Sequence, residues 1–226
     1  MTVYGQFCPV AKAMEVLDER WTLLVVRELL AGSSHFNELR RGVPKMSPAL
    51  LSKRLRSLVR AGVVRRRDAD NRVQYELTQC GRELAGVVES LGAWGVRWIG
   101  ELGEGDLDPH LLLWDLRRRL DLDAMPRSRT VISFVFDDVA SQAARWWLMV
   151  AGDNADICDY DPGFDVTVTV TTSLRTMTRI WRGDLEWQQA LGARAVVLSG
   201  DRAARRALPG WLRPGAFAGV PRPVAG

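Results

Sequence analysis

The stretch SPALLSKRLRSLVRAGVVRRR, residues 47–67, contains seven basic residues and no acidic one. It begins with Ser47, a residue type that caps helix N-termini, followed by a proline, which the first turn of a helix tolerates. Leu51, Leu55 and Leu58 then follow at i, i+4 and i+7, the spacing of one apolar helix face. A glycine ends the pattern. The stretch therefore predicts a helix with a leucine face and a basic face.

Helices are predicted before this stretch, and a hairpin after it. Apolar residues recur at helical spacing in residues 10–17, 21–32 and 36–41. Asp18 is placed to cap the second of these helices, and Ser33 or Ser34 the third. After the basic helix, two strand-like runs flank the turn 68–71, at residues 63–67 and 73–77. Short helices followed by a basic hairpin are the parts of a winged helix-turn-helix domain.

A further apolar stripe follows the hairpin. Between residues 81 and 99, large apolar side chains repeat every three to four positions, at Leu84, Val87, Val88, Leu91, Trp94 and Trp98. A helix with this stripe suits pairing with a second copy across a two-fold axis, and it equally suits packing on its own domain. The sequence leaves both alternatives open.

The composition is that of a globular protein with an uneven charge. The chain has 226 residues, of which 47% are hydrophobic and 26% charged, enough for one large domain or two ordinary ones. Residues 1–100 carry a net charge of +6, and residues 101–226 one of −2. No apolar run reaches the roughly 20 residues of a membrane span, and the N-terminus lacks a signal-peptide pattern. We expect a cytoplasmic protein without a membrane partner. If the protein has a polyanionic partner, we expect the first module to bind it.

The second module begins after an acidic, glycine-rich segment. Residues 1–100 form the first predicted domain, 101–106 a linker, 107–212 a second domain and 213–226 a tail rich in proline and glycine. The second domain has strand-like runs at residues 130–136, 144–150, 155–160, 164–171 and 195–198, and helical runs at 109–120, 174–181, 185–191 and 202–208. In the fourth strand, threonines alternate with valines that share one face, Val166, Val168 and Val170. This mixture predicts an α+β fold.

The basic helix and hairpin are suited to double-stranded DNA. A recognition helix lies in the major groove, where small residues near its start allow close approach and long cations reach bases or phosphates. The alternative is a solvated helix face, but such faces usually mix both signs, because like charges repel at short spacing. The residues predicted to contact DNA are His35, Lys45, Ser47, Ala49, Ser52, Lys53, Arg56, Arg65, Arg66, Arg67 and Arg72.

A joint pattern of residues resembles a known family. The pattern comprises Cys8-Pro9, Trp21, Gly32, Phe36-x-x-Leu39-Arg40, Met46-Ser47, Leu51-Ser52-x-Arg54-Leu55-x-x-Leu58, Gly62-Val63-Val64-x-Arg66 and Val73-x-Tyr75-x-Leu77-Thr78-x-x-Gly81. Over residues 8–98 the chain resembles the HxlR-type winged helix-turn-helix regulators, bacterial transcription factors related to the MarR group. The resemblance implies a homodimer, paired through terminal helices, that binds an inverted-repeat operator, with repression as the expected role. One departure is Val43-Pro44-Lys45, where the family commonly has a glycine-rich turn.

The three cysteines, Cys8, Cys80 and Cys158, are widely separated and show no metal-binding spacing. In some members of the resembled family, a cysteine at the Cys-Pro position senses quinones, aldehydes or oxidants, so the resemblance makes Cys8 a redox candidate. A place at a helix start, with Lys12 one turn away, would favour the reactive form of a thiol. The alternative is a structural cysteine. The other two cysteines are expected to be apolar fillers.

The second module carries a resemblance of its own. Its pattern comprises Phe134 and Phe136, Trp146-Trp147-Leu148-Met149-Val150, Asp156-x-Cys158-x-x-Asp161-Pro162-Gly163, the valine and threonine strand, Leu174, and Ile180-Trp181-x-Gly183 before Gly192. These residues resemble the sterol-carrier-protein-like fold over most of residues 107–212, which implies an apolar tunnel and a hydrophobic small-molecule effector. The residues predicted to line the tunnel are Phe134, Trp147, Phe164, Ile180, Trp181 and Trp211. The alternative is a filled core, for which the tryptophans supply enough bulk.

The sequence shows no catalytic or metal-binding pattern. Five aspartates between Asp153 and Asp165 lack the spacing and the terminal glutamate of a calcium loop, so they are expected to form turns. His35 and His110 have no nearby nucleophile or carboxylate array, and no phosphate-binding loop or nucleophile elbow occurs. We therefore expect a binding protein without cofactor or metal rather than an enzyme. Besides an effector-controlled regulator, a lipid carrier and an interaction module with a filled second domain stay open.

Overall fold

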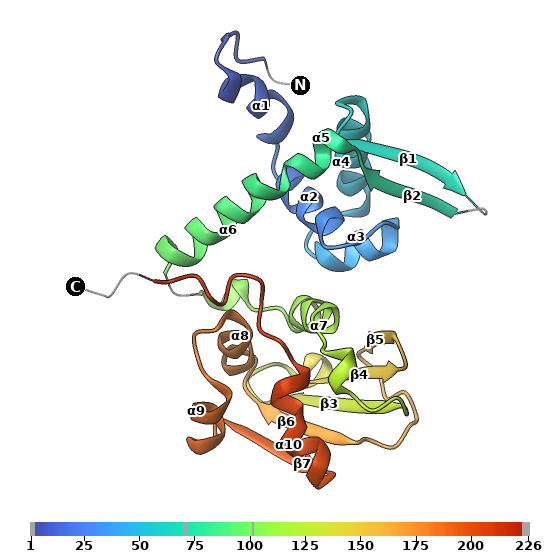
Figure 1. Cartoon of the computed structure of the whole chain (residues 1–226), viewed down its shortest axis with the longest axis vertical. Coiled ribbons are helices and arrows are strands. Elements are labelled where there is room, and N and C mark those ends of the chain that lie inside the picture. Colours follow the sequence, from blue (N-terminus) through green and yellow to red (C-terminus); the bar gives the residue numbers. More distant parts are fainter. Residues whose placement is uncertain (1–2, 70–71, 101, 223–226) are drawn as a thin grey trace. The chain divides into compact units, whose positions relative to one another are not determined.

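The computed structural model describes residues 3–69, 72–100 and 102–222 (Figure 1). Residues 70–71 of the predicted turn, residue 101 of the predicted linker and residues 223–226 of the predicted tail lie outside the described residues. The chain divides into two compact units, Met1–Gly95 and Val96–Gly226. The boundary falls within helix α6, Ala85–Trp98, ahead of the predicted linker.

The first unit is a winged helix-turn-helix. Its described elements are α1 (Pro9–Leu17), α2 (Thr22–Leu30), α3 (Phe36–Gly42), α4 (Pro48–Arg60), β1 (Val64–Ala69), β2 (Arg72–Leu77), α5 (Gln79–Glu83) and most of α6. Its core is an apolar cluster that joins α2, α3, α4 and the start of β1, including Val25, Val26, Leu39, Leu55 and Val64. The predicted helices and hairpin are confirmed. The apolar stripe of residues 81–99 is divided between α5 and α6, because Leu84 ends the shorter helix.

The helix caps differ from the predicted ones. Asp18 does not cap α2, since its carboxylate accepts the Tyr4 hydroxyl at 2.8 Å and the N-cap position is Trp21, with a left-handed backbone at φ 79°. For α3 the N-cap position is His35 rather than a serine. The Glu38 carboxylate accepts the backbone N–H groups of Ser34 and His35, at 2.8 and 3.1 Å. The Glu38 side chain, which lies inside the helix, therefore caps the start of α3.

The hairpin is attached to the start of α3. Strands β1 and β2 pair in antiparallel register from Val64 opposite Leu77 to Ala69 opposite Arg72. The N–H of Tyr75 donates to the carbonyl of Ser34 at 2.8 Å, and His35 forms an isolated bridge with Gln74. The segment before α3 thus lies along β2 as a third strand would, which fixes the hairpin to the helical core.

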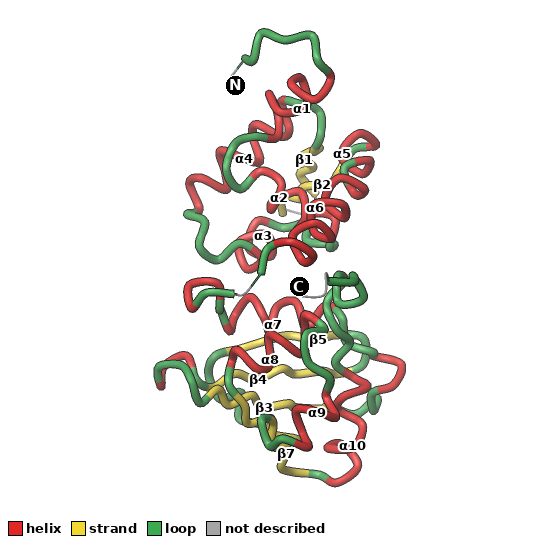
Figure 2. Tube along the Cα trace, turned by 90° about the vertical axis from the view of Figure 1, so that its left-hand side faces the viewer, coloured by secondary structure: helices red, strands yellow, loops and turns green. Residues whose placement is uncertain are grey.

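The second unit is a five-stranded sheet with helices. Its described elements are η1 (Glu104–Asp106), α7 (Pro109–Arg118), η2 (Leu122–Ala124), β3 (Thr130–Phe136), η3 (Ser141–Ala143), β4 (Arg145–Ala151), β5 (Asn154–Cys158), β6 (Val168–Thr172), α8 (Leu174–Arg182), α9 (Trp187–Gly192), β7 (Val196–Gly200) and α10 (Arg202–Trp211). The strand order is β5-β4-β3-β6-β7; the central pair of β3 with β6 is parallel, and the other three pairs are antiparallel. Figure 2 shows strands of this sheet in yellow and the helices of the unit in red. This arrangement confirms the α+β class of the second unit.

Most of the second core lies on one face of this sheet. Residues of α7, α8, α9 and α10 join alternate strand residues such as Phe134, Leu148 and Val170 in a single cluster. The opposite face holds a small separate cluster of Val131, Trp147 and Cys158. The expected alternation on β6 holds for Val168 and Val170, which are fully buried. It is wrong for Val166, which precedes the strand and is exposed.

Candidate nucleic-acid interface

Helix α4 packs through its leucine face, which leaves the opposite face outward. The Ser47 hydroxyl accepts the N–H of Leu50 at 3.3 Å, and a proline occupies the first turn. The predicted cap is therefore confirmed. The predicted leucine face is also confirmed, since its members are fully buried: Leu51, Leu55 and Leu58. Because side chains at i, i+4 and i+7 share one helix face, the residues on the other side meet solvent.

The outward face of α4 presents unpaired cations. Lys53 and Arg56 are exposed, and no carboxylate of the described residues pairs with either of them. Ala49 is exposed one turn before Lys53, and Ser52 is half-exposed beside it. The face thus begins with small side chains and continues with long cations. A helix of this kind can approach a groove closely and still reach the phosphates.

Arg54 lies in the same basic run but has a different role. Its side chain is only 10% exposed and forms an ion pair with Glu19. Its Nε also donates to the backbone carbonyl of Arg20 at 3.0 Å. The guanidinium of Arg54 therefore joins α4 to the segment between α1 and α2, and it adds no charge to the outward face.

The cations of the hairpin are paired, although the run 65–67 itself contains no acid. Glu76 on β2 accepts from Arg65 at 2.9 Å and also lies 3.3 Å from Arg67. Arg66, which side-chain alternation places on the other face of β1, pairs with Asp68 at 2.8 Å. Much of the positive charge of this run is therefore offset by carboxylates within the hairpin. These pairs are exposed, so DNA phosphates can compete for the arginines.

The remaining predicted DNA contacts lie at the edges of these two surfaces. Lys45 and Ser47 are exposed at and before the start of α4, and Arg72 is exposed at the start of β2. His35 lies at the base of the hairpin, where its Nδ1 is 3.1 Å from the hydroxyl of Ser34 and 3.5 Å from Glu38. The structure thus gathers Lys45 with the α4 residues and His35 with the hairpin.

A buried carboxylate, absent from the predicted site, positions the turn before α4. Glu28 is fully buried on α2 and accepts from Arg27 at 2.7 Å, and the same guanidinium nitrogen donates to the carbonyl of Gly42 at 3.0 Å. A Cβ at Gly42 would overlap the carboxylate of Glu28, so a larger residue at the end of α3 would displace this buried group. The one sequence signal was the interruption of an apolar run by Arg27 and Glu28.

Comparisons with known proteins identify the first unit. A model of the HxlR-like helix-turn-helix family matches residues 16–102. The chain is also 37% identical over 99 residues to the uncharacterized helix-turn-helix transcriptional regulator YvaP of Bacillus subtilis, and the match covers 42% of this chain and 92% of YvaP. The chain belongs to the HxlR-like helix-turn-helix family.

Two solved structures resemble parts of this HxlR-like chain. The transcriptional regulator YodB from Bacillus subtilis, in its reduced form, is 28% identical with a TM-score of 0.38, and the match covers 42% of this chain and 100% of YodB. The sec-alkylsulfatase Pisa1 from a Pseudomonas species is 22% identical with a TM-score of 0.40, covering 50% of this chain and 17% of Pisa1. The HxlR-like match ends at residue 102 and so does not reach the sheet of the second unit.

The predicted redox residue of this HxlR-like chain lies at a helix start. Cys8 is the N-cap residue of α1 and is half-exposed, and its thiol makes no capping hydrogen bond. Lys12, expected to support the thiol, is paired with Glu15 at 2.9 Å. Of the other two cysteines, Cys158 is buried, and burial raises the pKa of its thiol. Cys80 is exposed, so the expectation of an apolar filler is wrong for it.

The residues predicted to line an apolar tunnel are only partly brought together, because Trp147 and Phe164 lie apart from the others. Phe134, Ile180 and Trp211 are buried in the main cluster of the second unit. Trp147 lies in the small cluster on the other face of the sheet. Phe164 is exposed ahead of β6, with the Arg129 guanidinium 3.9 Å from its ring centre. Trp181 is half-buried and its backbone carbonyl accepts the N–H of Gly215 at 2.6 Å.

Two further expectations concern the aspartates and membranes. The Asp161 carboxylate accepts the N–H of Gly163 at 2.9 Å, and Asp153 pairs with Arg127 at 3.2 Å. Asp161 therefore forms a turn, as expected for this group of aspartates. In the part of the chain that the structure describes, no helix is both long and apolar enough to cross a membrane.

Proposed function

We propose that this chain is a DNA-binding transcriptional repressor of the cytoplasm, which acts by binding rather than by catalysis. The observation that carries the proposal is the outward face of α4, where Lys53 and Arg56 are exposed without a carboxylate partner among the described residues. Membership of a helix-turn-helix family whose relatives are named transcriptional regulators supports it. In this proposal α4 enters the major groove, and the hairpin of β1 and β2 contacts the adjacent backbone.

A DNA footprint tests this proposal. We expect the full chain to protect an inverted-repeat sequence in the promoter of its own gene. Affinity should fall with salt, since each neutralised phosphate contributes about 0.9 to the slope of log K against log salt concentration. Binding without any sequence preference would contradict the proposed function, and so would a salt slope near zero.

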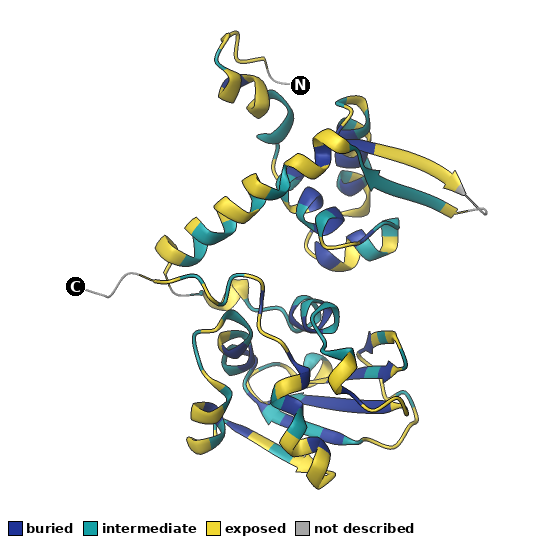
Figure 3. Cartoon of the chain, in the orientation of Figure 1, coloured by how far each residue is buried: buried dark blue, intermediate teal, exposed yellow. Residues whose placement is uncertain are grey.

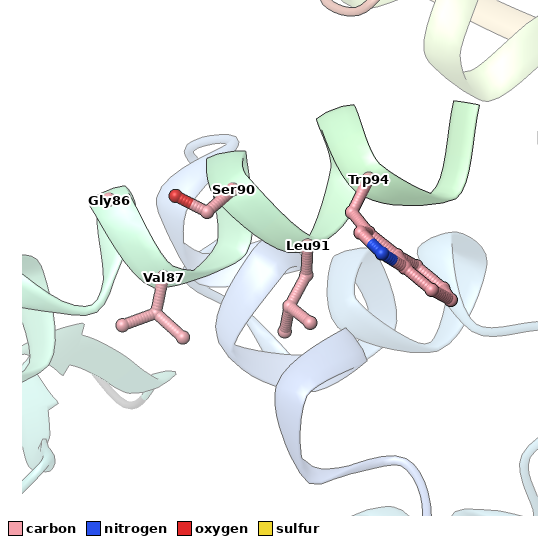
Figure 4. A pocket seen from close by; sticks show the side chains of 5 residues that line it. All are labelled: Gly86, Val87, Ser90, Leu91 and Trp94. Atoms are coloured by element: carbon pink, nitrogen blue, oxygen red, sulfur yellow. The ribbon is translucent and has the colours of Figure 1, made fainter. Parts of the chain in front are cut away.

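We also propose that the chain acts as a homodimer paired through α6. Of the apolar stripe, Leu84 and Val88 pack against the core of the first unit. Val87, Leu91 and Trp94 project from one side of α6 (Figure 4) and remain 43%, 49% and 56% exposed. Figure 3 shows exposed residues recurring along the whole helix. Large apolar side chains in one exposed row are typical of a protein interface.

Gel filtration with light scattering tests the dimer. Leu91→Asp places a charge in the apolar row and should convert the dimer to a monomer with much weaker operator binding. The matched control is Glu89→Gln, an exposed position of the same helix outside the apolar row. A wild-type chain that is monomeric at all concentrations would overturn this part of the proposal.

A second candidate function is redox or electrophile sensing through Cys8. Its half-exposed position at the start of α1 favours it. Operator release by a quinone should be faster for the wild type than for Cys8→Ser. Cys80→Ser is the control, because Cys80 is an exposed thiol of the same unit. Identical release from the wild type and Cys8→Ser would discard the thiol switch.

For the second unit, we propose a filled core in place of an apolar tunnel. Phe134, Leu208 and Trp211 are each at most 3% exposed within one cluster, which favours a structural role over lipid carriage or an apolar effector. The resemblance to the sterol-carrier-protein-like fold then concerns architecture and not cargo. An uncharged fluorescent sterol should show no saturable binding to the full chain. Saturable binding that Phe134→Trp abolishes would restore the tunnel.

A further inference from the structure

Helix α8 presents a row of arginines on its outward face. Its inward face is buried in the core of the second unit through Leu174, Met177 and Ile180. The start of the helix is fixed by Asp138, whose carboxylate accepts the N–H groups of Leu174 and Arg175, at 2.6 and 3.2 Å. Positions i, i+4 and i+7 share a helix face, so the opposite side carries Arg175, Arg179 and Arg182 in one row.

The C-terminal segment brings a fourth arginine to this row. The N–H of Gly215 donates to the carbonyl of Trp181 at 2.6 Å. A Cβ on Gly183 would lie 2.7 Å from the Cβ of Ala218, so the returning segment lies directly against the end of α8. Arg222 then reaches Asp184 and forms an ion pair with it. Residues of α8 and of the C-terminal segment line one hollow together with residues between positions 96 and 104.

The charges that line this hollow are not balanced. Five arginines line it, the four named above and Arg97, together with two acids, Glu104 and Asp184. Glu104 pairs with Arg175, and Asp184 is shared between Arg182 and Arg222. Arg179, in the middle of the row, has no carboxylate partner among the described residues. The predicted linker residue Glu104 is therefore part of this charged cluster.

Part of the cluster is withdrawn from water. The side chains of Arg182 and Asp184 are only 14% and 20% exposed. Burial lowers the pKa of Arg222, and the positive charge of Arg182 lowers it further. An excess of positive charge in partly buried surroundings attracts an anion more strongly than an exposed arginine does. Guanidinium groups also match the flat or tetrahedral oxygen pairs of carboxylates and phosphates.

We propose that this hollow binds the oxyanion group of a small molecule, a phosphate, sulfate or carboxylate, with Arg179 as its principal contact. Arg175 and Arg182 flank the bound group, and their acidic partners hold them in place when the hollow is empty. The site goes beyond the proposed DNA binding and does not depend on it, because its residues all belong to the second unit.

Isothermal titration calorimetry of the full chain without DNA tests this site, with sodium phosphate, sodium sulfate and sodium octanoate as probes. Saturable binding of at least one probe is expected. Binding of phosphate and sulfate alone assigns the site to a tetrahedral oxyanion, and binding of octanoate alone assigns it to a carboxylate. Absence of saturable binding of all three probes overturns the proposal.

Four variants separate this site from general charge attraction. Arg179→Gln should weaken binding at least tenfold without changing thermal stability, since the side chain is exposed. Arg206→Gln removes the same charge from an exposed position of α10 outside the hollow, and Arg56→Ala removes one from the proposed DNA face. Neither Arg206→Gln nor Arg56→Ala should change the affinity for the oxyanion probe. Glu104→Gln frees Arg175 and should tighten binding. An equal loss in all three arginine variants, or a loss in Arg56→Ala alone, overturns the site.

Discussion

Helix α4 and the hairpin of β1 and β2 carry neighbouring parts of one basic run, but their charges are arranged differently. On α4 the outward Lys53 and Arg56 have no carboxylate partner among the described residues. On the hairpin, Arg65 and Arg67 share Glu76, and Arg66 pairs with Asp68. The cations of the helix are therefore available to DNA at once. The arginines of the hairpin must leave their carboxylate partners before they can bind DNA phosphates.

This difference follows from secondary structure. The acids that pair with the hairpin arginines come from the facing strand, where Arg65 lies directly opposite Glu76, and from the end of the same strand. A helix that packs by its apolar face has no such facing strand, so its outward cations meet only solvent or a ligand. Base readout thus belongs to α4 in the proposed complex, and the hairpin supplies backbone contacts that depend on salt.

The largest expected effect comes from the buried arginine of α4. Arg54→Ala should lower the free energy of unfolding by about 2–3 kcal/mol, because it removes a buried cation whose partner Glu19 is itself partly exposed. The neighbouring Arg56→Ala should change stability by less than about 0.5 kcal/mol. Urea denaturation followed by circular dichroism measures both. Equal losses would mean that Arg54 and Arg56 face the same environment.

The next effect concerns affinity and specificity. Arg56→Ala should cost about 1–3 kcal/mol of operator binding and relax sequence preference if Arg56 reads a base. Arg66→Ala should weaken binding to operator and random DNA alike, and by less, because Asp68 already competes for it. Fluorescence anisotropy on both DNAs separates the two effects. Unchanged binding in both variants would show that α4 and the hairpin are placed wrongly on DNA.

A smaller effect on DNA affinity is expected when the ion pairs of the hairpin arginines are removed. Glu76→Gln frees Arg65 and Arg67 from their shared carboxylate, so binding to any DNA should tighten by up to about 1 kcal/mol, the usual range of an exposed pair. The salt slope should steepen by about 0.9 for each further phosphate that the freed arginines neutralise. Glu83→Gln is the control, because Glu83 is an exposed acid of α5 that binds only Gln79 among the described residues. Weaker binding in Glu76→Gln would mean that the pair positions the arginines for DNA.

Element order and the leucine face could be predicted because they depend on spacing within one segment. The strand at Thr130–Phe136 and the helix start at Ser47 follow from local residue types and were found at the predicted places. Ion pairing could not be predicted in the same way, since it depends on which segments meet. Arg54 and Glu19 are 35 residues apart in the sequence, and no local pattern marks them as partners.

The residues predicted to line a ligand tunnel also depend on which segments meet, and this could not be predicted from the sequence. Large aromatic side chains in a sheet domain can line a tunnel or fill a core, and composition does not distinguish the two. The face on which each residue lies depends on strand register. Phe134 pairs across the sheet with Trp146 and not with Trp147, so Trp147 points to the opposite face from Phe134. A shift of one residue in that register would have placed them together.

The smallest expected effect concerns the base of the hairpin. Partial burial raises the pKa of Glu38, but hydrogen bonds from the backbone N–H groups of Ser34 and His35 outweigh it and hold that pKa below its ordinary value. A carboxyl with a lowered folded-state pKa stabilises the fold above its unfolded pKa. This contribution is lost as pH falls through the lower, folded-state pKa.

The unfolding free energy of Glu38→Gln should therefore fall below that of the wild type at neutral pH and approach it in acid. Glu89→Gln is the control, because Glu89 is an exposed acid of α6 for which the described residues offer no such hydrogen bonds. The hairpin depends on this segment, since Tyr75 binds the carbonyl of Ser34. Loss of Glu38 should thus also loosen the hairpin, visible as faster amide exchange at Tyr75. Unchanged exchange at Tyr75 would show that β2 holds the segment without help from α3.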